Sequence, residues 1–347
     1  RKENDKNGMR CEISPNPDTF GLALRPGTLQ KPQRSSEGVA LMDGPAKDRG
    51  EVRLFAGVEL GGTKCIVTLA AGPGDIRDQR TIATTVPWET LPAIKAVLDE
   101  WAGSHGFCGL GIASFGPIRL DPAKAGYGQI GATNKPDWEG ADLLGPLQSA
   151  FDVPIGFDTD VNGAALAEIR WGSGRGLDDF AYVTVGTGVG VGLIVHGKPT
   201  RGFSHSEIGH VLVPRLKGDE TPSVCRFHDD CVEGLASGTA LNARLNGRPM
   251  ADVAADDPVW EPIVHTLASM VHSLACTTGP MRVAMGGGVL AGQPQLLPRI
   301  NAKLEASLSG YMQIPGDGAY VTAPELGTMA GPLGAIALAM DAVGAPA

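Results

Sequence analysis

Two histidines and two cysteines in one stretch of the chain have the types and spacing of metal ligands. His210 is followed by Cys225, His228 and Cys231. The pattern Cys-x2-His-x2-Cys puts three nitrogen or sulfur donors in one tight loop, and four such donors without an open position are typical of structural zinc. The alternatives are free thiols beside surface histidines, or a disulfide between the two cysteines. Because intracellular chains rarely keep disulfides, we predict a zinc site.

An aspartate lies where a predicted strand over residues 155–158 meets a predicted helix over residues 162–171. The carboxyl ends of strands face the ligand-binding edge of an α/β sheet. Asp160 in that position could accept the proton of a substrate hydroxyl while the hydroxyl oxygen attacks phosphorus. Aspartate before a helix is also a common N-cap, and the segment alone favours that interpretation. Since Asp158 is close by, one aspartate can cap the helix while the other does chemistry.

Two glycine-threonine turns, which begin about 125 residues apart, could each bring the backbone close to a phosphate. Glu59 ends the strand before the first turn and could hold Mg²⁺ through water, because that ion prefers oxygen ligands. One such turn can be an ordinary hairpin, but two turns facing each other across a cleft could grip a polyphosphate from both sides. A third glycine run, after another strand, could lie against adenine. The predicted nucleotide-contacting residues are Glu59, Gly61, Gly62, Thr63, Lys64, Gly186, Thr187, Gly188, Gly286, Gly287 and Gly288.

Strands predicted on both sides of each turn would position these residues. The strand–turn–strand unit occurs twice, which suggests two related domains rather than a solenoid, whose repeats are about 20–50 residues long. Helices and further strands complete an alternating α/β pattern. The predicted strands are 54–59, 65–70, 109–113, 155–158, 181–185, 189–195 and 283–285, and the predicted helices are 91–101, 162–171, 262–278 and 329–340.

Length and composition bound the function classes. The chain has 347 residues, of which 42% are hydrophobic, enough for two domains with cores of their own. Its net charge of −9 argues against nucleic acid as a partner, since nucleic-acid binders usually carry a basic face. We find no apolar run of about eighteen residues and no apolar segment of a secretory signal, so we expect a cytoplasmic protein without a membrane partner.

Residues 1–50 differ from the rest of the chain. They contain five prolines and many Ser, Asn, Lys and Arg residues without a sustained hydrophobic period. Such a segment cannot bury enough apolar surface to offset its loss of conformational entropy. We therefore predict a disordered N-terminal extension.

Over about residues 54–342 these motifs together resemble the ROK family, named for repressor, open reading frame and kinase. The segments that carry the resemblance are Glu207-Ile208-Gly209-His210 and Cys231-Val232-Glu233-Gly234. The match to the fructokinase branch is closer still. That branch tends to have the opening Glu-x-Gly-Gly-Thr-Lys, a Ser-Phe-Gly-Pro-Ile segment (here 114–118), Asp-Thr-Asp-Val-Asn (158–162) and the Cys-x2-His-x2-Cys loop.

The resemblance implies an α/β, actin-like and hexokinase-like (ribonuclease H-like) fold of two domains with ATP in the cleft between them. The first domain would comprise residues 51–158 with the C-terminal helix 328–347, and the second residues 159–327 with the zinc loop. Asp160 would be the catalytic base, and His210 would touch both sugar and zinc. The residues implied at the sugar are Ser114, Gly116, Asn134, Glu207, His210 and Glu233. The segment around Asn134 has Asp137 where the family usually has glycine.

The implied activity is transfer of phosphate from Mg-ATP to a hexose, with D-fructose as the preferred substrate and fructose 6-phosphate as product. Thr159 stands where glucokinase-type members have asparagine, which weakens a glucose assignment. Mannose, glucose or an N-acetylhexosamine are alternative substrates. The family also contains sugar-responsive repressors with an N-terminal helix-turn-helix domain, but residues 1–50 show no helical period. Family resemblance further implies a homodimer.

Overall fold

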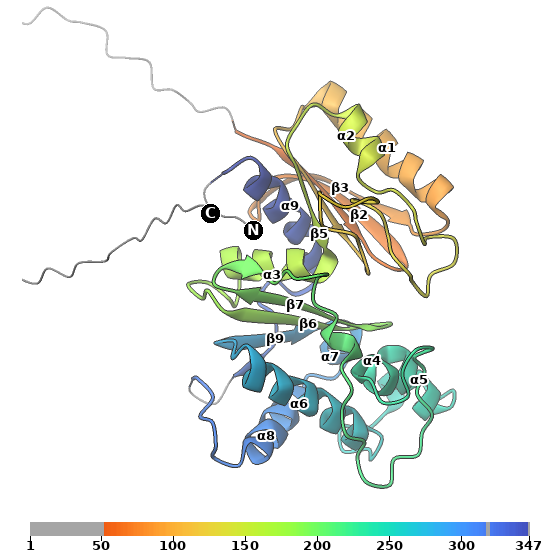
Figure 1. Ribbon diagram of the computed structural model, residues 1–347, viewed down its shortest axis with the longest axis vertical. Helices are drawn as coiled ribbons and strands as arrows, with labels where there is room; N and C mark the ends of the chain where they lie inside the picture. The colour runs from red at the N-terminus through yellow and green to blue at the C-terminus, as the bar shows by residue number, and fades with distance from the viewer. Residues whose placement is uncertain (1–51, 317–319, 346–347) are drawn as a thin grey trace, which may run out of the picture. The chain divides into compact units, whose positions relative to one another are not determined.

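The computed structural model describes residues 52–316 and 320–345 (Figure 1). The predicted disordered extension over residues 1–50 lies outside these ranges. The strands are β1 (Phe55–Leu60), β2 (Lys64–Gly72), β3 (Asp75–Ala83), β4 (Leu110–Ser114), β5 (Ile155–Thr159), β6 (Phe180–Val185), β7 (Val189–Val195), β8 (Lys198–Pro199), β9 (Arg282–Gly286) and β10 (Val321–Thr322). The helices are α1 (Pro87–Ser104), α2 (Gly145–Ala150), α3 (Asp160–Trp171), α4 (Val232–Ala236), α5 (Gly238–Leu245), α6 (Trp260–Thr277), α7 (Gly288–Gly292), α8 (Leu296–Leu308) and α9 (Ala330–Ala342), with short 3-10 turns at Ile208–His210, Met250–Asp252 and Gly327–Met329.

The strands form two mixed sheets with one shared topology. The strand order is β3-β2-β1-β4-β5 in the first sheet and β8-β7-β6-β9-β10 in the second. In each sheet an antiparallel hairpin (β1 with β2, β6 with β7) pairs in parallel with a later strand (β4 or β9). The prediction of an α/β fold with a repeated strand–turn–strand unit is therefore confirmed.

The register of the first sheet brings three loop segments to one edge. Leu60 of β1 is the partner of Ser114 of β4, and Ser114 is the partner of Thr159 of β5. These parallel strands therefore end side by side. The turn after β1, the segment that begins at Phe115 and the start of α3 emerge together, at the edge where α/β sheets bind ligands.

Helices α3 and α9 lie between the two sheets (Figure 1). Helix α3 follows the last strand of the first sheet and packs on β6 and β7, whereas α9 follows the last strand of the second sheet and packs on β1, β4 and β5. A Cβ atom on Gly334 would lie 2.4 Å from the carbonyl carbon of Gly163, so α9 cannot carry a side chain at this crossing point. Each of these two helices therefore follows one sheet in sequence and packs on the other.

Each sheet also has an apolar core on its other face, which α1 and α2 cover in the first sheet and α6 and α8 in the second (Figure 1). Trp101 and Trp138 are fully buried in the first core, and Trp260 in the second. In residues 52–316 and 320–345, no helix is both long enough and apolar enough for a membrane crossing.

Thr159, and not an aspartate, caps α3. Its hydroxyl oxygen accepts a hydrogen bond from the backbone N–H of Asn162 at 3.2 Å. Asp158 is buried one residue earlier, where it pairs with Arg201 and accepts a hydrogen bond from the Asn162 side chain at 2.8 Å. The sequence-based preference for an aspartate cap is therefore wrong, because threonine already satisfies the first turn of the helix. Asp160 is the first helical residue.

The pattern of the sequence did not indicate β3, β8 and β10. Strand β3 is a mostly exposed edge strand whose side chains include the ion pairs Arg77–Asp75 and Arg80–Asp78, so it lacks the apolar alternation of a buried strand. Strands β8 and β10 have only two residues each. Such short strands leave no periodic signal.

Candidate active site

A cavity of about 800 Å³ opens between the two glycine turns. Many of the residues predicted from the sequence line it: Gly62, Thr63, Gly116, Asn134, Asp160, Gly186, Thr187, Gly188, Glu207, His210 and Glu233. The volume is within the range of small-molecule sites. Segments from both sheets therefore meet around one space large enough for a ligand.

Asp160 faces this cavity from the first position of α3, the helix that begins at the edge of the first sheet. One of its carboxylate oxygens accepts a hydrogen bond from the Val161 N–H at 2.9 Å. Burial raises the pKa of the Asp160 carboxyl from 3.8 to about 6, against the lowering effect of backbone hydrogen bonds. The group is therefore ionised above about pH 6, and its basicity is higher than that of an exposed aspartate.

Glu59 lies behind the first turn and does not line the cavity. Its Oε2 atom is buried, and among the described residues it has no hydrogen-bond partner. Burial, followed by the charge of Asp160, raises the pKa of the Glu59 carboxyl to about 7, while Lys64 lowers it. An unsatisfied carboxylate oxygen of this kind needs a proton, water or a cation.

Two hydrogen bonds from helix α5 hold the second turn, Gly186–Gly188. Gly238 N–H donates to the carbonyl of Gly186 at 2.7 Å, and the Thr239 hydroxyl donates to the carbonyl of Thr187 at 2.8 Å. Both donors belong to α5, which is capped by Ser237. The conformation of the turn is thus fixed by the helix beneath it.

Glu233 connects the second turn to the predicted metal ligands. Its Oε2 accepts a hydrogen bond from Val189 N–H at 3.1 Å, and its Oε1 lies 3.8 Å from Nε2 of His210. A Cβ atom on Gly188 would lie 2.4 Å from Glu233 Oε2. Glycine at position 188 therefore makes room for this carboxylate.

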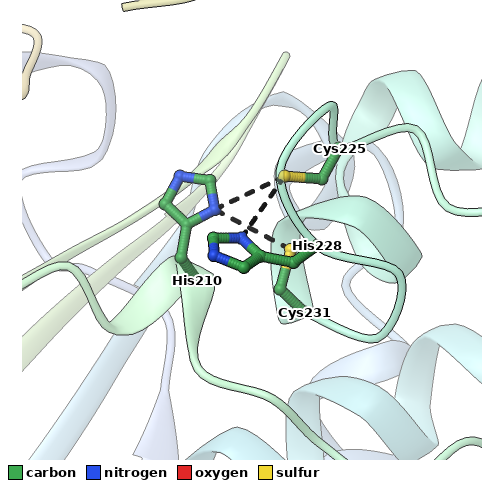
Figure 2. A group of neighbouring side chains, drawn as sticks. All are labelled: His210, Cys225, His228 and Cys231. Carbon is green, nitrogen blue, oxygen red and sulfur yellow. Dashed lines mark hydrogen bonds between the residues drawn. The ribbon is translucent and has the colours of Figure 1, made fainter. Parts of the chain in front are cut away.

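His210, Cys225, His228 and Cys231 converge as Figure 2 shows, with their ligand atoms all within 4.8 Å of one another. Nδ1 of His210 lies 3.8 Å from the Cys225 sulfur and 3.7 Å from the Cys231 sulfur, and Nδ1 of His228 lies 3.6 Å from the Cys225 sulfur. In tetrahedral zinc coordination the distance between neighbouring nitrogen and sulfur ligands is about 3.6 Å. The donor set and its spacing therefore fit zinc.

The second nitrogen of His210 faces Glu233, the arrangement in which a carboxylate orients a metal-ligating imidazole. Burial raises the pKa of the Cys231 thiol, and the neighbouring Cys225 raises it further. Buried thiols of this kind become thiolates only with a positive charge beside them, which a bound zinc ion supplies.

Several predicted residues lie outside the cavity lining. Ser114 is fully buried and donates its hydroxyl hydrogen to the carbonyl of Phe115. The run Gly286–Gly288 joins β9 to α7; a Cβ atom on Gly287, whose φ is 90°, would lie 2.5 Å from the backbone of Val185. The remaining predicted residues that do not line the cavity are Glu59, Gly61, Lys64, Cys225, His228 and Cys231.

The loop that contains Asn134 is tied to the first turn. Nζ of Lys135 donates hydrogen bonds to the carbonyls of Gly62 and Thr84, and Asn134 itself is exposed. Asp137 has a φ of 66°, in the left-handed region that glycine adopts most readily. The aspartate at this position therefore adopts a backbone conformation that glycine, the residue implied here by the family resemblance, adopts more readily.

Sequence reasoning missed three cavity-lining residues with nitrogen-bearing side chains: Lys135, His205 and Arg226. Lys135 directly follows Asn134, and His205 precedes Glu207 by two residues. Arg226 lies inside the metal loop, with its guanidinium 4.5 Å from the ring centre of Phe227. Proximity to the predicted residues was the available signal.

Known proteins share the sequence and the fold of this chain. The model of the ROK family matches residues 55–342. A fructokinase from Pediococcus pentosaceus is 38% identical over 290 residues, which cover 84% of this chain and 99% of that protein. The structure of a ROK hexokinase from Thermus thermophilus superposes with a TM-score of 0.69 at 25% identity, over 84% of this chain and 99% of that one. A ROK glucokinase from Streptomyces griseus, in complex with glucose and AMPPNP, gives a TM-score of 0.67 at 25% identity, over 83% and 99%.

The chain therefore belongs to the ROK family. The family predicted from the motifs is confirmed, and so is the fold that the family implies.

Proposed function

We propose that the protein is an ATP-dependent hexose kinase that converts D-fructose to fructose 6-phosphate. The observation that carries this proposal is the convergence of both glycine turns and Asp160 on one cavity. The glycines of the two turns allow backbone N–H groups to approach a polyphosphate closely. A carboxylate that lines the same cavity can accept the proton of an attacking hydroxyl group.

Asp160 would act as general base on the primary hydroxyl of the sugar. As the hydroxyl proton moves to the carboxylate, the sugar oxygen bonds to the γ-phosphorus, and the bond from that phosphorus to the bridging oxygen of ADP breaks. A pKa of about 6 leaves Asp160 ionised at neutral pH and basic enough to take part of the proton in the transition state.

The backbone N–H groups of the two turns and the Thr63 hydroxyl would contact the phosphates. Mg²⁺, when bound with ATP, would neutralise charge on the phosphates. Glu59 is the residue proposed to hold its water shell, because the buried Oε2 atom of that side chain has no hydrogen-bond partner among the described residues. Gly286–Gly288 is the proposed adenine contact.

Glu207, Glu233 and His210, which also line the cavity, would bind the sugar hydroxyls. Carboxylates accept paired hydrogen bonds from neighbouring hydroxyls. Burial, followed by the charges of Glu233 and Asp160, raises the pKa of the Glu207 carboxyl to about 7. Zinc bound by the four-ligand cluster would fix His210 and hold the loop that precedes Glu233. Gly116 and Asn134, which line the cavity, complete the proposed sugar contacts, and the buried Ser114 would support the Gly116 segment from behind the lining.

Fructose is favoured by the fructokinase from Pediococcus pentosaceus, and the ATP donor by the AMPPNP complex of the Streptomyces griseus glucokinase. The glucose in that complex makes glucose the first alternative substrate. A homodimer remains part of the proposal on family grounds.

The test is release of ADP from Mg-ATP in a coupled assay, measured against fructose, mannose, glucose and N-acetylhexosamines in parallel. We expect the highest kcat/KM with fructose. A higher value with another hexose would replace the substrate but keep the class of enzyme, whereas no ADP release with any sugar would contradict the kinase assignment. Binding of the full chain to operator DNA in a gel-shift experiment would instead support a repressor.

A further inference from the structure

His205 is a buried side chain beside Glu207, one of the proposed sugar contacts, and has no role in the function proposed so far. It lies between β8 and the 3-10 turn Ile208–His210, lines the cavity, and its side chain is 2% exposed. Burying an imidazole without hydrogen-bond partners would cost free energy of folding. The partners of His205 therefore indicate its role.

The contacts of His205 fix its tautomer. Its Nε2 atom accepts a hydrogen bond from the backbone N–H of Ile118 at 3.0 Å. Because that nitrogen is an acceptor, the proton of the neutral ring lies on Nδ1. Nδ1 lies 3.2 Å from the carbonyl oxygen of Ser206 and 3.5 Å from Oε1 of Glu207. Burial lowers the pKa of His205, which favours this neutral form.

These contacts link segments from the two sheets. Ile118 follows β4 of the first sheet, whereas His205 and Glu207 follow β8 of the second. A Cβ atom on Gly116 would lie 3.2 Å from the imidazole and 3.4 Å from the Glu207 carboxylate, so both side chains press on the same point of the backbone. His205 therefore lies at a contact between the two halves of the site.

Glu207 itself needs an orienting group. Its side chain is 45% exposed, and in the described part of the chain its carboxylate has no hydrogen bond to another side chain. A long side chain in that situation occupies several rotamers, and the loss of that freedom weakens binding.

We propose that His205 is a positioning residue that anchors on the Ile118 backbone and holds the Glu207 carboxylate toward the bound sugar. This proposal rests on the proposed function, in which Glu207 contacts the sugar. His205 acts through Glu207 and touches no reacting atom. Its loss should therefore weaken sugar binding and leave the ATP side unchanged.

The test is a double-mutant cycle with His205→Gln and Glu207→Gln, read as the KM for the best sugar of the panel. Glutamine keeps an acceptor near the position of Nε2 but loses the donor toward Glu207. We expect His205→Gln to raise the sugar KM about 10-fold, because the Glu207 carboxylate loses the ring N–H that lies 3.5 Å from it, with the KM for ATP unchanged. In the Glu207→Gln background the same substitution should change the sugar KM less than about 2-fold, because coupled residues are not additive.

Exposed His105→Gln is the matched control and should leave both KM values unchanged. A melting curve for each variant establishes that it is folded. An equal KM increase in both backgrounds, or none in either, would overturn the proposal while leaving an active wild-type enzyme intact. A wild-type protein inactive on every sugar would instead remove the proposed function and this inference with it.

A second readout needs no variant. Nitrogen-15 NMR of the wild-type histidines should show His205 with a protonated Nδ1 and an unprotonated Nε2 at neutral pH. A protonated Nε2 would contradict the anchor on Ile118, whatever the stability of the His205 variants.

Discussion

At the scale of single residues, the base role proposed for Asp160 requires a buried charge that lowers the stability of the folded chain. Its pKa in the folded chain is raised from 3.8 to about 6 by burial. The folded state therefore holds this proton more tightly than the unfolded state, and the free energy of unfolding falls as pH rises through this window. Above about pH 6, where Asp160 is ionised, the full loss of unfolding free energy from its burial is present. Active sites commonly carry such a penalty where a charged group must be buried.

Asp160→Asn should therefore stabilise the protein at pH 8. The amide has no charge to bury and can still accept the hydrogen bond from Val161. One pKa unit corresponds to about 1.4 kcal/mol, and 1 kcal/mol shifts the melting temperature of a chain of this size by about 2–4 °C. The shift from 3.8 to about 6 is about two units, or about 3 kcal/mol, so we expect a gain of up to about 6–12 °C by calorimetry at pH 8, shrinking as the pH is lowered toward 5. A lower melting temperature for the variant at pH 8 would contradict the burial penalty.

The pKa of the Asp160 carboxyl also predicts how kcat/KM falls at acid pH. Since the base must be ionised, kcat/KM for the sugar should fall as the pH drops through about 6, the pKa of Asp160. Glu207 has a pKa of about 7 and can add a second acid limb, so the profile is also measured for Glu207→Gln. The limb near pH 6 should persist in that variant. A rate independent of pH between 8 and 5 would exclude a carboxylate base with this pKa.

At the scale of elements, the loop from Cys225 to Cys231 and the helix α4 form one unit around the metal ligands. Cys231 caps α4, and Glu233 on that helix reaches both His210 and the second turn. Glu233 thereby connects the four-residue cluster to the second glycine turn. The spacing of the ligands predicted this cluster because all but one of them lie within seven residues of sequence.

Cys225→Ser should lower both the zinc content and the melting temperature, because metal binding is coupled to folding. We expect less than about half of the wild-type zinc by mass spectrometry and a loss of more than about 5 °C. Cys276→Ser, at an exposed position away from the cluster, is the control and should change neither quantity. Full zinc content in the Cys225 variant would remove that residue from the ligand set.

Gly188→Ala tests the contact between the second turn and α4. The new methyl group would lie 2.4 Å from Glu233 Oε2, so the carboxylate or the turn must move. We expect kcat/KM to fall about 10-fold or more, since displacement of about 1 Å in a site can cost that much. Gly74→Ala in the β2–β3 turn has open space around the new Cβ and serves as the control. Wild-type kinetics in Gly188→Ala would show that the contact does not matter.

At the scale of the whole molecule, repetition in the sequence predicts the repeated sheet, whereas only the family resemblance places helix 328–347 with the first domain and residues 159–171 with the second. Each helix follows one sheet and packs on the other, and the pattern of apolar residues names no partner surface. We keep the division into residues 51–158 with 328–347 and residues 159–327 as a proposal; the packing of α9 on the first sheet supports it.

The same limit applies to the site. Local spacing predicted the two turns, Asp160 and the His/Cys cluster, and the structure brings these residues together. The sequence did not predict His205 and Lys135 as site residues, because their hydrogen-bond partners are backbone groups more than 50 residues away in sequence. Those partners come together only when the two halves of the cavity meet.

The central claim is that Asp160 takes the hydroxyl proton of a sugar during phosphoryl transfer. The measurement that tests it most directly is formation of fructose 6-phosphate from fructose and Mg-ATP by the wild-type protein and by Asp160→Asn, with fructose affinity measured by calorimetry on both. We predict a loss of at least about 10³-fold in kcat, with the dissociation constant of fructose within about 3-fold of the wild type. A variant that keeps the wild-type rate would contradict the account.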